Sequence, residues 1–259
     1  MPAPWPHLQE APITEALIDA RCELPSDVNL KTLAGLHDAF GAAYPKKLLV
    51  AEWQQQIQLG TSEAPPEAKA PTGGPQGYRF DSSDGLQVLQ ARINGFTLSR
   101  LRPYQDWHHL ITEFKRCWEF YVTIAGVKRV SRIATRFINR IAVPTPVAEI
   151  ADWLYTRPEL PSGLNFSISD YSLTFVAPCD ENGTSAIIRQ FTEAADRTLS
   201  IPIIFDIDVF REVSLTPPSL KEMWSILDEL RTIKNQVFFS SITPRTLSLF
   251  KPEESRGAH

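Results

Sequence analysis

The stretch VKRVSRIATRFINRIAVP, residues Val127 to Pro144, decides the fold. Side chains two positions apart lie on the same face of a β-strand. From Ser131 onward the odd positions are apolar or neutral, and the even positions carry a cation at every fourth residue from Lys128 to Arg140. The β-branched and aromatic content favours a strand over a helix. We therefore predict one long strand with an apolar face and a face carrying the cationic row Lys128, Arg132, Arg136 and Arg140.

Composition describes an ordinary globular protein. Of its 259 residues 43% are hydrophobic and 22% charged, and the net charge of −4 gives no sign of nucleic-acid binding. The start of the chain lacks the charged and apolar regions of a signal peptide, and no apolar run approaches the roughly 18 residues that span a bilayer. Three scattered cysteines, Cys22, Cys117 and Cys179, predict buried, reduced thiols. We expect a cytoplasmic protein with no membrane contact.

Apolar periodicity and turn residues divide the remaining chain into strands and helices. Residues 60–77 are rich in Pro, Gly, Ala and Glu, which predicts a flexible loop. Asp84–Gly85 marks a hairpin turn, and Asn94–Gly95 a second turn or a bulge. The elements expected before the long strand are strand 13–23, helix 27–44, strand 46–59, strands 78–81 and 86–101, and helix 104–124. Those expected after it are helix 146–155, strands 166–176, 184–192 and 199–213, and helix 219–236.

The order of elements repeats, because each half reads β-α-β-β-β-α. This pattern predicts an α+β fold built from a duplicated unit, with mostly antiparallel sheets backed by helices. We expect one unit in 1–126 and a second in 127–250, packed into one compact domain, with a disordered tail in 251–259. Helices bearing several tryptophans and phenylalanines predict surplus apolar surface, and hence a homo-oligomer such as a dimer.

An acidic row in the strand 199–213 is the counterpart of the cationic row, and three interpretations stay open. Opposite charges on neighbouring strands would form a structural ladder of ion pairs. Alternatively, Arg132, Arg136, Asn139 and Arg140 hold an anionic ligand such as a phosphate or carboxylate. In the third interpretation Asp206, Asp208 and Glu212 bind a metal ion in a phosphoesterase or nuclease. The chain has no GxSxG, HExxH or phosphate-binding loop motif, which weakens an enzymatic interpretation.

Several short segments, taken in order, carry a resemblance that spans nearly the whole chain. They are Ala11–Ala16, Gly77–Phe80, Tyr104 with Trp107, Arg136–Arg140, Asp206–Asp208 and Phe239–Thr243. In these segments the chain resembles a sporadically distributed family of uncharacterised bacterial proteins of about this length. The resemblance implies fold and length, with no activity, cofactor or site residue to carry over. Patchy distribution is typical of mobile or defence-linked genes.

These observations favour a non-catalytic binding or interaction protein, with a role as an accessory of a bacterial defence or mobile-element system. We expect no cofactor, and a protein partner or an anionic ligand; the sequence does not decide whether nucleic acid is a partner. The metal-dependent phosphoesterase or nuclease is the first alternative. A chaperone-like binder of a partner protein is the second, and it requires an exposed apolar groove.

Overall fold

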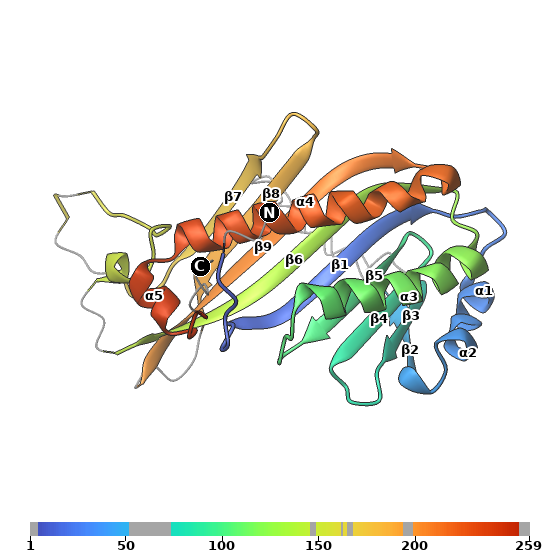
Figure 1. Ribbon diagram of the computed structural model, residues 1–259, viewed down its shortest axis with the longest axis horizontal. Coiled ribbons are helices and arrows are strands. Elements are labelled where there is room, and N and C mark those ends of the chain that lie inside the picture. Colours follow the sequence, from blue (N-terminus) through green and yellow to red (C-terminus); the bar gives the residue numbers. More distant parts are fainter. Residues whose placement is uncertain are drawn as a thin grey trace, which may run out of the picture.

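A single antiparallel sheet of nine strands forms the frame of the computed structural model, in the order β2-β3-β4-β5-β1-β6-β9-β8-β7 (Figure 1). The structure describes residues 5–51, 74–145, 149–161, 163–164, 168–193 and 199–253. The fold is therefore α+β, as predicted. The long helices α3 and α4 cross the same face of the sheet, and α1 and α2 cover its β2–β3 end (Figure 1).

The first half of the chain supplies five strands. The chain makes a hairpin turn at Ile93–Asn94, and Gly95 opens the next strand, so the predicted strand 86–101 is two strands, β4 and β5. The predicted loop 60–77 falls mostly outside the described residues, but its last residues, 75–77, belong to β3. The strands are β1 (Ile13–Glu23), β2 (Lys46–Ala51), β3 (Pro75–Asp81), β4 (Gln87–Arg92) and β5 (Gly95–Leu101).

The predicted helix 27–44 is wrong in detail, because Gly35 divides it into α1 (Leu30–Ala34) and α2 (Leu36–Phe40). A short 3-10 turn, η1 (Gly41–Ala43), follows. Asn29 caps α1, since its side chain accepts from the backbone amides of Lys31 and Thr32. The predicted helix 104–124 is present as α3 (Trp107–Ala125), which Asp106 caps at its start.

The second half supplies four strands and the remaining helices. Only a 3-10 turn, η2 (Ile150–Asp152), forms in the described part of the predicted helix 146–155. A 3-10 turn, η3 (Pro217–Glu222), forms at the start of the predicted helix 219–236, so the last long helix begins at Met223. The other elements are β6 (Arg129–Pro144), β7 (Ser172–Pro178), β8 (Thr184–Thr192), β9 (Ser200–Leu215), α4 (Met223–Ser241) and α5 (Pro244–Ser248).

The two halves meet at the central pair of strands, β1 and β6. One continuous apolar core lies between the sheet and the helices, and includes Phe96 and Phe114 from the first half and Phe137 and Phe205 from the second. The two ends of the described chain also meet. The backbone amides of Gln9 and Glu10 donate to the carbonyls of Lys251 and Phe250, at 3.3 and 3.1 Å. Residues 251–253, part of the stretch predicted to be a disordered tail, therefore lie against the N-terminal segment.

Candidate functional site

β6 carries the alternation that its sequence predicts. Ile133, Phe137 and Ile141 are buried in the core. Arg132, Arg136 and Arg140 have the opposite parity, and so lie on the side of the sheet away from the helices. We call this side the polar face. The predicted acidic row lies beside the arginines, because β9 pairs with β6 in a register that sets Arg132 opposite Glu212 and Arg136 opposite Asp208.

Arg136 binds Asp206 side-on. Its Nε and Nη2 donate to the two carboxylate oxygens, each at 2.7 Å, and this bond raises the pKa of the guanidinium. The guanidinium of Arg189, on β8, lies 3.3 Å from the same carboxylate. The Asp206 side chain is only 4% exposed. Its buried charge is therefore compensated by two cations, as burial of an ion requires.

Arg132 faces three carboxylates, at 3.3 Å from Asp208, 3.7 Å from Asp19 and 3.9 Å from Glu212. The pKa of Asp208 is raised above its ordinary value, because the effect of burial outweighs the opposing effect of the neighbouring Arg132 and Arg136. Arg140 donates to Glu193 at 2.6 Å. Ion pairs thus connect strands across the polar face. We call this set the charge lattice, and its members are Asp19, Arg132, Arg136, Arg140, Arg189, Glu193, Asp206 and Asp208.

Asn139 does not lie with the three arginines, so the grouping predicted for it is corrected. Its odd position turns the side chain to the helix-bearing side, where it is 2% exposed. There Nδ2 donates to the carbonyl of Phe205 at 2.9 Å and to that of Phe137 at 3.3 Å. The sequence already implied that Asn139 and the three arginines lie on opposite faces, because they occupy odd and even positions of the strand.

The three residues proposed as metal ligands are turned toward arginines. Asp206 is paired with Arg136 and Arg189, and Asp208 and Glu212 are both near Arg132. Among the described residues no group of three His, Cys, Asp or Glu side chains is placed to hold a metal ion. The geometry of the described carboxylates gives the phosphoesterase interpretation no support.

The polar face is hollowed. A cavity of about 700 Å³ is lined by residues of β2, β3, β4, β5, β1, β6 and β9, so the sheet curls around it. We call it the hollow. Charged side chains of both signs line it: Glu15, Asp19 and Asp208 are acidic, and Arg21, Arg92, Arg132 and Arg136 are basic.

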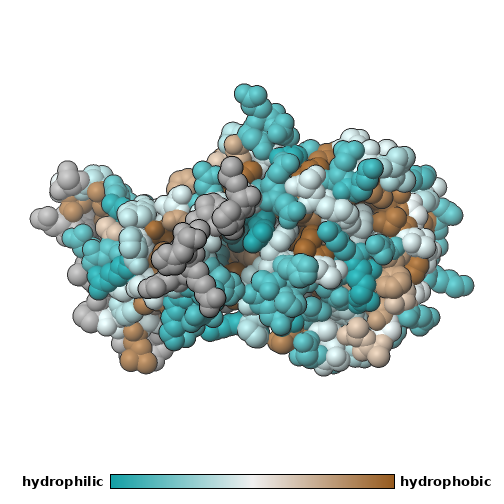
Figure 2. Space-filling model, viewed as in Figure 1, coloured by the Kyte–Doolittle hydropathy of each residue, from teal (hydrophilic) through white to brown (hydrophobic). Residues whose placement is uncertain are grey.

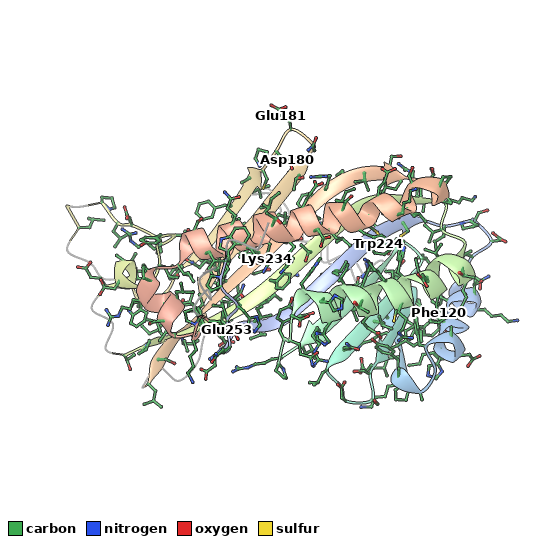
Figure 3. The ribbon with its side chains drawn as sticks, viewed as in Figure 1. Phe120, Asp180, Glu181, Trp224, Lys234 and Glu253 are labelled. Atoms are coloured by element: carbon green, nitrogen blue, oxygen red, sulfur yellow. The ribbon has the colours of Figure 1, made fainter. Side chains whose placement is uncertain are left out.

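A second, smaller cavity lies on the opposite side of the sheet, and sequence reasoning missed it. It holds about 230 Å³ between the N-terminal segment, the start of α3, β6 and α4. Lys234 reaches into it from α4 (Figure 3). We call it the lysine pocket. The signal in the sequence was a lysine within the apolar stripe Leu227, Leu230 and Phe238, at a spacing where α4 faces the sheet.

The cysteines form no bridge. Cys22 and Cys117 are buried, as predicted, and burial raises the pKa of both thiols. Cys179 is exposed, which corrects the prediction for that residue.

None of the described helices has the length and apolar character needed to cross a membrane. Comparison with models of known protein families gave no match, and comparison with curated proteins gave no match either.

Proposed function

We propose that the protein is a non-catalytic binding protein and that the hollow is the surface on which it holds a partner protein. The observation that carries the proposal is the pairing of charges beside a wide hollow. The described carboxylates of β9 are engaged by arginines, so the lattice neither needs a metal nor offers a free acid–base pair. The hollow itself is lined by charged side chains of both signs from the described residues.

Both signs of charge line the hollow, which suits a polypeptide better than a simple anion. A partner segment with acidic and basic side chains can match such a surface, and matching of this kind gives specificity. Arginine has five N–H donors, and the pair with Asp206 uses two from Arg136, whose side chain is still 37% exposed. Donors thus remain for a partner while the lattice stays intact. The alternative, a small anion held by the arginine row, requires those pairs to open.

A photo-crosslinking amino acid at Ser131, which lines the hollow, tests the proposal in cells of the natural host. We expect one discrete crosslinked species, which disappears when Arg21→Glu reverses a charge of the hollow. Arg21 is exposed and forms no ion pair with the described residues, so this change spares the lattice. The matched control places the crosslinker at Glu119, exposed on α3. The same species from both positions, or one unaffected by Arg21→Glu, would refute the proposal.

The proposal includes a dimer. The edge strands of the sheet support it, and not the aromatic side chains of the helices from which it was predicted. The aromatic side chains of α3 are largely buried, and hydrophilic side chains cover most of the helix-bearing side (Figure 2). Exposed apolar side chains instead occupy the two edge strands, Leu48 and Leu49 on β2 and Phe175 and Val176 on β7. Edge strands pair readily with another chain. We propose that β7 pairs with a second copy, because Val176 is 70% exposed there.

The strand order also supports an origin by duplication. Outward from the central pair, the first half runs β1-β5-β4-β3-β2 and the second runs β6-β9-β8-β7, so the two orders correspond except that the first half has one more strand at its edge. Each half thus places its first strand at the centre, and a long helix follows the strand beside it. A cytoplasmic location accords with three unpaired cysteines. The role in a bacterial defence or mobile-element system rests on the family resemblance alone and stays a prediction.

A further inference from the structure

The lysine pocket contains two cations, Lys234 and Arg231, that have no anionic partner among the described residues. Lys234 is 8% exposed, and its Nζ lies 3.8 Å from the centre of the Phe137 ring. Arg231, three residues earlier on α4, lies over the ring of Trp107 at 5.7 Å. Within the described part of the chain, no carboxylate forms an ion pair with either side chain. Both cations line the same cavity.

The other buried cations of the described chain, Arg132 and Arg211, have carboxylate partners. Arg211 is also buried, and two carboxylates compensate it, Asp180 at 3.1 Å and Glu229 at 2.8 Å. Arg132 is buried among three carboxylates. Burial of an ion without a counter-ion is costly, and a cation–π contact offsets only part of that cost. A bound anion would supply the partner that Lys234 lacks.

The other groups around the cavity restrict the ligand further. Its walls are largely aromatic, and include Tyr104, Trp107, Phe137 and Phe238. One charged group of opposite sign lies there, Asp106, but its Oδ1 caps α3 and accepts from the backbone and ring nitrogens of His109, both at 2.8 Å. His7 and Tyr104 are the remaining titratable residues of the lining, and burial raises the pKa of the Tyr104 hydroxyl. The cavity thus combines apolar walls with an excess of positive charge.

We propose that the lysine pocket binds a small organic carboxylate with a flat, apolar body. The carboxylate lies on the Lys234 ammonium and the Arg231 guanidinium, and the body packs among the aromatic side chains. A volume of about 230 Å³ suits a small molecule rather than a polypeptide segment. This site is separate from the hollow, since the two lie on opposite sides of the sheet and share no lining residue.

The protonation of Lys234 supports the proposed carboxylate site and provides a way to measure binding. Burial, with a smaller contribution from Arg231, lowers the pKa of Lys234 to about 7. An anion beside the ammonium favours its charged form, so binding should raise this pKa and take up protons from solution near pH 8. His7, Tyr104, Asp106 and Arg231 are the other titratable or charged groups in the lining, and Lys234 is the buried cation of this set.

Calorimetry with benzoate, phenylacetate and indole-3-carboxylate, each at millimolar concentration, tests the proposal. We expect at least one of them to bind, its neutral amide to bind far more weakly, and the heat to vary with the ionisation enthalpy of the buffer near pH 8. Lys234→Met should weaken binding about ten- to a hundredfold, which is the worth of a hydrogen bond between charged groups. Arg231→Gln should weaken it in the same direction.

Arg245→Gln is the matched control, because Arg245 also lies over a tryptophan, Trp153 at 4.3 Å, away from the pocket. Binding should be unchanged in this variant and in Arg21→Glu, so loss of the hollow's partner and loss of the carboxylate are separate results. Failure of all three carboxylates to bind would overturn the proposal. Equal binding of acid and amide, binding unaffected by Lys234→Met, or preference for inorganic phosphate over every carboxylate would do the same.

Discussion

Arg136 on β6 and Asp206 on β9 are joined side-on by two hydrogen bonds of 2.7 Å, with the carboxylate buried and the guanidinium partly exposed. Removal of the arginine leaves the buried Asp206 carboxylate with Arg189 as its one remaining ion-pair partner among the described residues. We expect Arg136→Ala to lower the free energy of unfolding by about 2 kcal/mol. Lys251→Ala, which opens an exposed pair with Glu10, should cost less than about 1 kcal/mol. Urea unfolding of both variants measures the difference, and equal costs would argue against a stabilising lattice.

Lys234 makes stability depend on pH. Its pKa is lowered to about 7 in the folded protein, against an ordinary value of 10.5. Between pH 7 and 10.5 the unfolded chain binds more protons than the folded protein does. The free energy of unfolding should therefore rise with pH in that range. Lys234→Met removes the buried charge, and should stabilise the protein most below about pH 7, with the gain shrinking toward pH 10.

Lys115→Met is the control, because this lysine lies over Trp224 at 5.0 Å but is less buried. Urea unfolding over a pH series should show a flatter profile for Lys234→Met alone. The same change of slope in both variants would contradict the assignment.

Gly77 allows β3 and β4 to approach closely. A Cβ built at this position would lie 2.0 Å from the carbonyl oxygen of Ala91, a backbone atom that cannot turn away. Gly77→Ala should therefore lower the free energy of unfolding by about 1–3 kcal/mol. Gly74→Ala meets nothing within 4 Å and should be close to neutral. A thermal melt of each variant is sufficient, and a neutral Gly77→Ala would show that the strands can separate locally.

Val176 tests the proposed dimer. A lysine on an edge strand opposes pairing with another chain. Sedimentation should show that Val176→Lys dissociates at lower concentration than the wild type, while Val176→Thr, which keeps a branched side chain without charge, behaves like the wild type. If Val176→Lys associates as strongly as the wild type, β7 is not the dimer interface.

The sequence predicted what depends on local periodicity. The alternation of β6, the acidic row of β9 and the turn at Asn94 are read from neighbouring residues, and each is present in the structure. The break at Gly35 was missed because an apolar stripe continues through it. Pairing of β1 with β6 joins distant segments and leaves no local pattern. Lys234 was missed as a site residue because its role depends on residues far away in the sequence, Phe137 on β6 and Trp107 on α3.

The central position of β1 has a consequence for folding. β1 precedes the other described strands along the chain, yet its neighbours in the sheet come much later: the carboxylate of Asp19 accepts from Thr97, 78 residues on, and the backbone carbonyl of Leu17 accepts from Thr135, 118 residues on. Pairing over such separations must first overcome the entropy of closing a long loop, which slows folding. While the chain emerges from the ribosome, the apolar side of β1 stays without its final neighbour until β6 has been made. Newly made chains of this protein are thus most exposed to aggregation during that interval.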